Sequence, residues 1–333
     1  MQTTKIWPSP KIVVIGGGTG TSTILKGLKK YTDYLTAIIS VMDDGGSTGR
    51  LRNDLDLIAV GDLRSCLLSL ANAENNMDQL LNYRFKDGDL AGHNFGNIFI
   101  AAMNGIYHDF SDAIAMTAKI LNITGKVLPI TLDNANLIAR LSNGHTIVGE
   151  SKIPEENHKY GTKISEITTE PGDIYMLEEA KEAIMKADIV ILGPGSLYTS
   201  IIPNLLAKDM VELLNKTKAK VVYVANIMCQ IGETEGYSVR NHYDAIIEHS
   251  KEGIIDYVII NNSEIDQDLL EIYRKAYSDK VIYTEEDRKY FSNKNIKVLE
   301  APISCVYKDM IRHDSYKLAD LIVKKIYREG SYD

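Results

Sequence analysis

The stretch KIVVIGGGTG, residues 11–20, decides the fold of this chain. Residues 12–15 are all β-branched, and they lead directly into three consecutive glycines. An apolar-periodic segment that contains Ile24, Leu25 and Leu28 follows. This pattern predicts a buried parallel strand, a glycine turn and the N-terminus of a helix.

The glycine turn predicts a phosphate-binding loop. Glycines allow positive φ angles and a close approach of the backbone to a ligand. The free N–H groups and the dipole at a helix N-terminus favour an anion there. A tight turn without a ligand is the alternative, but three consecutive glycines exceed what a turn needs. The residues assigned to ligand binding are Gly16, Gly17, Gly18, Thr19 and Gly20.

The spacing of these glycines differs from the dinucleotide fingerprint. Counted from Gly16, the G-x-G-x-x-G pattern is met at Gly18 but places Thr21 at the third glycine. A lone approximate match is weak support for a nicotinamide cofactor. The loop therefore predicts a nucleotide without identifying NAD.

Length and composition indicate a large soluble α/β protein. With 333 residues the chain exceeds the size at which a single core stops growing. We expect one domain over residues 1–333, a Rossmann-like, doubly wound, mostly parallel sheet. A largely helical segment at 62–121 and an antiparallel hairpin lobe at 136–170 are expected as insertions.

The net charge of −8 gives no basic footprint for nucleic acid or for an anionic membrane surface. The N-terminal sequence has no apolar signal region, and no apolar run approaches the ~20 residues that a membrane span needs. Cys66, Cys229 and Cys305 are far apart, and we interpret them as buried thiols in a reducing compartment. A cytoplasmic protein is expected.

A second ligand loop is predicted after the strand at residues 35–41. Two carboxylates there enter a glycine- and serine-rich segment, and ligands of open α/β sheets bind beyond the carboxyl ends of strands. An acid at this place can hold a ribose hydroxyl, and a pair can hold a metal. A simple turn is the alternative, since Asp-Gly and Gly-Gly form turns. The residues assigned here are Asp43, Asp44, Gly45, Gly46 and Ser47.

Three other features of this half of the chain matter for the site. Arg50 and Arg52 are open to two interpretations, phosphate contact or solvated surface charge. Asp62 is expected to be the N-cap of a helix over residues 63–70, and a functional role is equally open. A glycine-flanked loop at residues 92–97 adds His93 and Asn94 as further site candidates.

The segment 136–153 has a strand-like alternation on both sides of Asn143-Gly144. Leu137, Ala139 and Leu141 alternate before the turn, and Thr146 and Val148 after it. This pattern predicts a hairpin with a type I′ turn.

A second strand–glycine–helix unit follows at residues 187–200, where the third clear strand ends in GPGSLYTS. Two such loops in one chain suggest a ligand held from both sides. We therefore add Gly193, Gly195 and Ser196, and also Asn226, which follows the strand at residues 221–225. Near the end, Asp314 is expected to cap a helix over 315–327. Arg312 is a candidate phosphate ligand, with a surface charge as the alternative.

With these motifs in view, the chain resembles the YvcK-like gluconeogenesis factors, a branch of the CofD-like (UPF0052) family. The resemblance covers nearly the whole chain. It is carried by KIVVIGGGTGTSTILKGLK, SVMDDGGSTGRLR, GDLRSCLLSLA, GHNFGNIF, ILGPGSLYTSIIPNLL, NIMCQIGETEGYS and the terminal RHD. It implies a Rossmann-like fold, a role in growth on gluconeogenic carbon and in cell shape, and binding of UDP-sugars such as UDP-N-acetylglucosamine. It also implies nucleotide-sugar contacts at Arg312 and at Tyr277.

The other branch of the family, the CofD transferases, implies a different function. These enzymes move a phospholactyl group from a guanosine-diphosphate donor to a deazaflavin, with magnesium. The chain departs from their pattern at VGDLRSC, residues 60–66, where the transferases carry acidic SPDLDT-like residues.

Three functions therefore remain open. The first is a regulatory protein that binds a nucleotide sugar, which is favoured over an enzyme, with a homodimer as one option. The second is a CofD-type 2-phospho-L-lactate-like transferase, in which Asp43, Asp44 or Asp62 would hold magnesium or orient the acceptor. The third is an NAD(P)-dependent oxidoreductase. No required cofactor and no metal site are expected, because no cluster in the sequence has a dedicated ligand spacing. The expected ligand is a UDP-sugar, with NAD or a guanosine nucleotide as alternatives.

Overall fold

The computed structural model describes residues 8–72 and 75–329. The strands of its largest sheet are β1 (Ile12–Gly16), β2 (Leu35–Ile39), β3 (Lys126–Pro129), β7 (Ile189–Leu192), β8 (Lys220–Val224), β9 (Tyr257–Asn261) and β10 (Lys297–Ala301). Two smaller antiparallel sheets contain β4 (Asn136–Leu141), β5 (Thr146–Val148) and β6 (Ile164–Glu170), and β11 (Ser304–Tyr307) and β12 (Met310–His313).

The α-helices are α1 (Gly18–Leu28), α2 (Gly46–Leu55), α3 (Gly61–Leu70), α4 (Asn75–Asn82), α5 (Phe95–Tyr107), α6 (Phe110–Ile120), α7 (Ile153–Tyr160), α8 (Glu178–Lys186), α9 (Ile202–Leu205), α10 (Met210–Lys216), α11 (Val239–Glu248), α12 (Gln267–Lys275), α13 (Glu285–Asn293) and α14 (Ser315–Leu321). Short helical turns are η1 (Glu150–Lys152), η2 (Leu197–Ile201) and η3 (Ile322–Arg328). In the described part of the chain, no helix is both long and apolar enough to cross a membrane.

The central sheet has the order β10-β9-β8-β7-β1-β2-β3, and all its strand pairs are parallel. The chain moves outward from β1 to β3, and then returns to place β7 on the other side of β1. The strand order therefore reverses between β1 and β7, which is the point where open α/β sheets bind ligands. This topology confirms the predicted α/β, Rossmann-like fold class.

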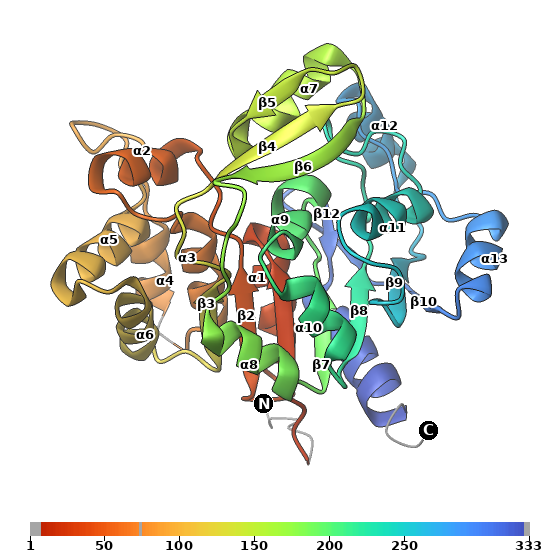
Figure 1. The fold of residues 1–333 in the computed structure, drawn as a ribbon, viewed down its shortest axis with the longest axis horizontal. Coiled ribbons are helices and arrows are strands. Elements are labelled where there is room, and N and C mark those ends of the chain that lie inside the picture. Colours follow the sequence, from red (N-terminus) through yellow and green to blue (C-terminus); the bar gives the residue numbers. More distant parts are fainter. Residues whose placement is uncertain (1–7, 73–74, 330–333) are drawn as a thin grey trace.

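The strands of this sheet are buried because helices cover both faces. Residues 12–15 of β1 are at most 2% exposed, as a strand buried on both sides requires. On one face α1 packs against α3 and α14. Figure 1 shows α8 and α10 in front of the sheet, α2 and α4 to α6 at its left, and the β4-β5-β6 lobe above it.

The lobe corrects the predicted hairpin turn. β4 pairs with β5 and β6, and Leu137, Ala139 and Leu141 are buried as the alternation predicted. The turn is not type I′, because Gly144 has a positive φ and Asn143 does not. The loop between the strands is four residues long, so Ile147 is buried while Thr146 and Val148 are exposed.

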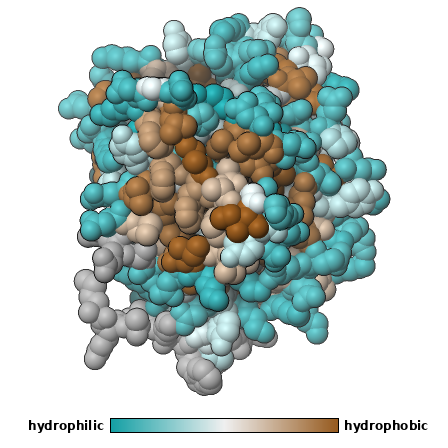
Figure 2. Space-filling model, turned by 90° about the vertical axis from the view of Figure 1, so that its left-hand side faces the viewer, coloured by the Kyte–Doolittle hydropathy of each residue, from teal (hydrophilic) through white to brown (hydrophobic). Residues whose placement is uncertain are grey.

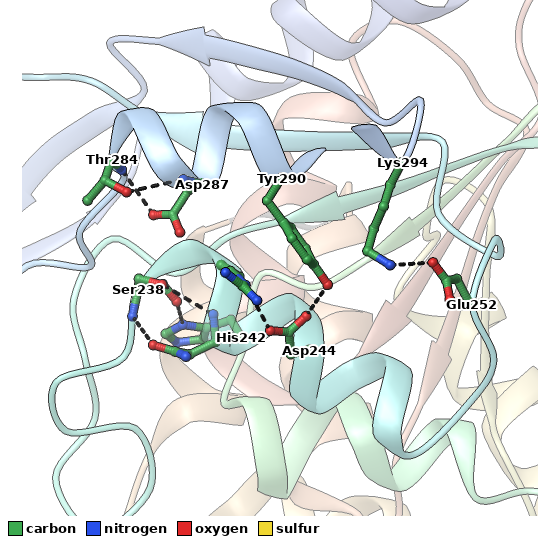
Figure 3. Close-up of polar contacts among 10 residues, drawn as sticks. Ser238, His242, Asp244, Glu252, Thr284, Asp287, Tyr290 and Lys294 are labelled. Carbon is green, nitrogen blue, oxygen red and sulfur yellow. Dashed lines mark hydrogen bonds and ion pairs between the residues drawn. The ribbon is translucent and has the colours of Figure 1, made fainter. Parts of the chain in front are cut away.

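A network of polar side chains joins α11 and α13 beside the right-hand edge of the sheet (Figure 3). Ser238 and Thr284 each form a capping box at the start of their helix. The hydroxyl of Tyr290 on α13 donates a hydrogen bond of 2.5 Å to Asp244 on α11. His242 is buried on α11, and burial lowers its pKa to about 4. The hydrogen bond between Tyr290 and Asp244 holds α11 against α13.

The cysteines agree with their prediction only in part. Cys66 and Cys229 are buried, but Cys305, on strand β11 of the two-stranded hairpin, is half-buried. All three are free thiols.

Candidate functional site

A cavity of about 560 Å³ lies at the reversal point of the sheet and extends toward the lobe and the β11-β12 hairpin. The predicted site residues that line it are Gly17, Gly18, Thr19, Gly20, Asp43, Asp62, Gly195, Ser196, Asn226 and Arg312. Those not among its lining residues are Gly16, Asp44, Gly45, Gly46, Ser47, Asn94, Gly193 and Tyr277. Segments from the whole length of the chain thus meet in one pocket.

The glycine loop joins β1 to α1 at the centre of this cavity. Gly17 is the N-cap of α1, and it provides no side chain to bond the first N–H groups of the helix. Gly18 adopts a φ of 52°, which favours glycine. A Cβ at Gly20 would lie 2.1 Å from the carbonyl oxygen of Pro194, so the loops after β1 and β7 are in direct contact. A helix N-terminus whose N-cap residue has no side chain can bind an anion.

Asp62 is not the N-cap of α3, as the sequence had predicted. The N-cap is Val60, and Asp62 lies in the first turn with its carboxylate against the glycine loop. The backbone of Gly18 donates a hydrogen bond to this carboxylate. Burial, together with the charge of Asp43, raises the pKa of Asp62 to about 7. The helix therefore begins two residues earlier than predicted. Because Asp62 does not cap the helix, its side chain can line the cavity.

Three carboxylates from two segments form a cluster beside the glycine loop. Asp43, Asp44 and Glu150 each offer one oxygen, and these oxygens all lie within 4.8 Å of one another. Asp43 accepts a hydrogen bond of 2.8 Å from the Gly45 N–H group. Asp44 accepts one of 2.9 Å from Ser151, which fixes the lobe and its residue Glu150 against the main sheet.

The electrostatics of this region favour protonation or a cation. Burial and four neighbouring carboxylates raise the pKa of Glu150 to about 8, and burial raises the pKa of Asp43. Buried Glu233, one of those neighbours, has a pKa of about 7, mainly because of burial. Among the cavity-lining residues Arg312 is the only arginine or lysine. A divalent cation would balance this charge, and carboxylate oxygens are the ligands that Mg²⁺ prefers.

Arg50 and Arg52, which follow the two aspartates in sequence, make structural hydrogen bonds and do not line the cavity. Arg52 is only 7% exposed and donates to the carbonyl oxygens of Asp43 and Ala135 at 3.1 and 3.0 Å. Arg50 donates to the carbonyl oxygen of Ala91 on the other side. Both arginines therefore position the loop that carries the aspartates.

The loops after β7 and β8 form a polar wall. Gln230 donates a hydrogen bond of 2.6 Å to the hydroxyl of Ser196, and Asn226 donates one of 3.4 Å to Gln230. The side-chain oxygen of Asn226 is buried, and it has no partner within the described residues. Because Asn226 lines the cavity, this oxygen is available to a donor on a ligand.

The β11-β12 hairpin closes the far side of the cavity. Arg312 is half-buried, and within residues 8–72 and 75–329 it has no carboxylate partner; its Nη2 lies 3.2 Å from Met310 Sδ. The Tyr273 hydroxyl accepts a hydrogen bond of 2.8 Å from the Ile311 N–H group, and Tyr273 lines the cavity. Tyr277 is 70% exposed, and its ring faces His158.

Ser47, His93 and Asn94 form a structural group behind the acidic loop. The Ser47 hydroxyl lies 3.3 Å from His93 Nδ1 and accepts a hydrogen bond from the Asn94 N–H group. Asn94 also caps α5 through the Asn97 N–H group. These contacts hold α2 against α5. They give Ser47, His93 and Asn94 structural roles that need no bound ligand.

Sequence reasoning missed several lining residues, above all Glu150, Tyr273 and Met310. Glu150 belongs to the lobe, far in sequence from the aspartates, and no pattern in the sequence indicates that the lobe folds over the site. Tyr273 and Met310 belong to a helix and a hairpin that the sequence analysis did not predict. The one sequence feature that could have indicated this part of the site is the apolar sequence just before Arg312.

Comparison with known proteins identifies the family. The family model described as 2-phospho-L-lactate transferase CofD matches residues 12–304. The chain belongs to the CofD family. The gluconeogenesis factor of Bacillus subtilis is 41% identical over 315 residues, 94% of this chain and 97% of that protein. A protein of Thermoanaerobacterium thermosulfurigenes, also named as a gluconeogenesis factor, is 50% identical over 314 residues, 94% of this chain and 96% of its own length.

A solved structure agrees with these relatives. The crystal structure of a UPF0052-family protein from Bacillus halodurans has a TM-score of 0.89 and 38% sequence identity, over 94% of this chain and 99% of that one. The resemblance to the YvcK-like branch of the CofD family is therefore confirmed.

Proposed function

We propose that this protein binds a nucleotide sugar of the UDP-N-acetylglucosamine type. It would act as a cytoplasmic regulatory protein in growth on gluconeogenic carbon and in cell shape. The observation that carries the proposal is the cavity itself, which is lined by the N-terminus of α1, by Arg312 and by a polar wall. The names of the relatives support the gluconeogenic role.

The diphosphate would bind at the glycine loop. N–H groups of the first turn of α1 and the hydroxyl of Thr19 are the donors at its N-terminus. Arg312 would approach from the hairpin, and its planar fork of N–H groups suits phosphate oxygens. Because no carboxylate of residues 8–72 and 75–329 pairs with Arg312, its guanidinium can make this contact.

Two groups of lining residues differ in character, which suits the two ends of a nucleotide sugar. Ile227, Met228, Tyr273 and Met310 offer apolar and aromatic surface for a planar base. Asp43, Asp62 and Glu150 carry carboxylates that could accept hydrogen bonds from sugar hydroxyls.

Calorimetry with UDP-N-acetylglucosamine, a guanosine dinucleotide and NAD tests the proposal. We expect the UDP-sugar to bind most tightly, and to be recovered unchanged after incubation with the protein. Preferential binding of NAD would instead support the oxidoreductase, and preferential binding of the guanosine dinucleotide the transferase.

A CofD-type transferase is the second candidate, and the cluster of Asp43, Asp44 and Glu150 favours it. The three carboxylates fit a magnesium ion, because their oxygens are close and two of their pKa values are raised. Bound magnesium would neutralise charge on the diphosphate of the donor. Asp43 and Asp44 would then hold the ion while the glycine loop orients the phosphates.

Chelation separates the two candidates. In the regulatory proposal, UDP-sugar affinity persists in EDTA, whereas a strict requirement for magnesium would favour the transferase. Glu150→Gln should weaken any magnesium-induced rise in melting temperature, and Glu155→Gln, an exposed carboxylate on α7, is the matched control.

A further inference from the structure

A second cavity, of about 380 Å³, adjoins the loop that carries Asp43 and Asp44. Its lining residues are Asp44, Gly49, Arg52, Asn53, Asn134, Asn136, Ser151 and Lys152. Asp43 lines the first cavity and Asp44 the second, and in the lobe Glu150 lines the first and Ser151 the second. The acidic loop and η1 therefore border both cavities. A volume of this size is enough for a small molecule.

The lining of the second cavity is polar. Each described residue that lines it carries a charge, an amide or a hydroxyl group, apart from Gly49. The surface of the neighbouring helices is different, because Figure 2 shows hydrophobic side chains gathered on the side of the molecule where α4 to α6 lie. The amides of Asn53 and Asn136 can both donate and accept hydrogen bonds. This lining suits a small ligand that carries hydroxyl groups.

Arg52 brings a buried positive charge to this cavity. Its hydrogen bonds with described residues all go to neutral oxygens, those of the Met42, Asp43 and Ala135 carbonyls and of the Asn134 and Asn136 amides. Burial lowers the pKa of Arg52 although the charges of Asp44 and Asp43 raise it, so the two aspartates offset its burial only in part. Buried charges in proteins are normally paired. Within residues 8–72 and 75–329 Arg52 has no ion-pair partner, and a bound anion would supply one.

Lys152 supplies a second cation. It is the last residue of η1, it is exposed, and no carboxylate of the described chain forms an ion pair with it. Of the three charged residues that line the second cavity, Arg52 and Lys152 are cations and Asp44 is an anion. Asp44 already accepts a hydrogen bond of 2.9 Å from the Ser151 N–H group. The second cavity therefore favours an anion, whereas three carboxylates and one arginine line the first.

We propose that the second cavity binds a small hydroxylated anion, such as a sugar phosphate or a sugar acid, beside Arg52 and Lys152. Lys152 would donate hydrogen bonds to the anionic group directly. Arg52 would act mainly through its charge, because its terminal N–H groups already donate to neutral oxygens. The amides of Asn53 and Asn136 would bind hydroxyl groups of the same molecule. This ligand is distinct from the nucleotide sugar proposed for the first cavity.

Calorimetry in EDTA, with glucose 6-phosphate, gluconate and glucose as probes, tests the proposal. We expect one anion to bind per chain, and the tighter of the two identifies phosphate or carboxylate as the preferred group. Uncharged glucose should bind at least about tenfold more weakly than this anion. Lys152→Glu should lower the affinity for the anion at least about tenfold, because a carboxylate would replace a cation. Lys159→Glu, at an exposed lysine on α7 of the same lobe, is the matched control and should bind like the parent.

Two further variants locate the bound anion. Asn53→Asp, at an exposed position of α2, should also weaken binding, because it adds a negative charge to the lining. Arg312→Glu alters the first cavity alone, so it should bind the anion like the parent, whether or not a nucleotide sugar binds there. Weaker binding by Arg312→Glu with unchanged binding by Lys152→Glu would place the anion in the first cavity and overturn the proposal. Failure of both anions to bind, or equal binding of glucose, would also overturn it.

Discussion

The N–H group of Gly18 donates a hydrogen bond to the carboxylate of Asp62. A Cβ on Gly18 would lie 2.9 Å from an oxygen of that carboxylate, and the φ of 52° at Gly18 also favours glycine. The chain thus holds an anionic group of its own at the N-terminus of α1, where the phosphate of a ligand is expected. The acid and the glycine loop form one unit, and changes in either should affect ligand binding.

Replacing Gly18 tests the loop. Gly18→Val should abolish nucleotide binding, because the side chain would occupy the space of the phosphates and displace Asp62. It should also lower the free energy of unfolding by about 1–2 kcal/mol, the cost of a left-handed backbone for a residue with a Cβ. Calorimetry and urea denaturation measure the two effects.

Gly88→Val is the matched control for this change. Gly88 has a φ of 72°, and nothing lies within 4 Å of its ideal Cβ position. It should therefore lose comparable stability and keep its nucleotide affinity. Nucleotide binding by folded Gly18→Val would contradict the phosphate-loop assignment.

The raised pKa of Asp62 predicts a pH-dependent cost in stability. Its pKa is about 7 when folded and 3.8 in a model peptide, so the unfavourable burial of the charge grows as pH rises through this interval. Asp62→Asn removes the charge. Its gain in unfolding free energy over the parent should therefore be larger at pH 8 than at pH 5, by about 2–3 kcal/mol.

Urea denaturation of both proteins at the two pH values measures this difference. Asp89→Asn, at an exposed loop position, serves as the control and should show no comparable change. An equal effect of Asp62→Asn at both pH values would mean that Asp62 is not buried as described.

The fold could be predicted from the sequence where patterns are local. The β-branched run of residues 12–15, its glycines and the comparable GPGSLYTS unit each indicate a strand end and a helix start within a few residues. Parallel strands in a doubly wound sheet carry their loops to the same edge. Gly18 and Ser196 could therefore be assigned to one site, and both line the cavity.

What could not be predicted depends on contacts between distant segments. Glu150 joins the aspartates only because Ser151 bonds Asp44 and brings the lobe over the sheet. Asp62 looked like an N-cap because Asp caps helices well. Tertiary burial beside Gly18 placed it elsewhere. The residues Ser47 and Asn94 had site-like neighbours in sequence, but they bond each other instead.

The acidic pair can be tested without disturbing the fold. Asp43 and Asp44 accept backbone hydrogen bonds from Gly45 and Ser151, and the side-chain oxygen of Asn can accept the same bonds. The double change to Asn should therefore keep the fold, and because it removes charge from partly buried Asp43, whose pKa is raised, the melting temperature should not fall. It should weaken ligand binding by about 1–3 kcal/mol, as expected for hydrogen bonds to charged groups. Equal affinity in calorimetry would indicate a purely structural turn.

The most direct test of the account is the affinity of Arg312→Glu for UDP-N-acetylglucosamine by calorimetry. Arg312 lies near the end of the chain and the glycine loop near its beginning, yet both line one cavity. We predict at least about a tenfold loss of affinity, equivalent to ~1.4 kcal/mol, with little change in the melting temperature of the unliganded protein. Arg140→Glu, on the exposed surface of the lobe, should bind like the parent. Unchanged affinity of Arg312→Glu, or a large loss of unliganded stability, would contradict the claim that both ends of the chain form one nucleotide-sugar site.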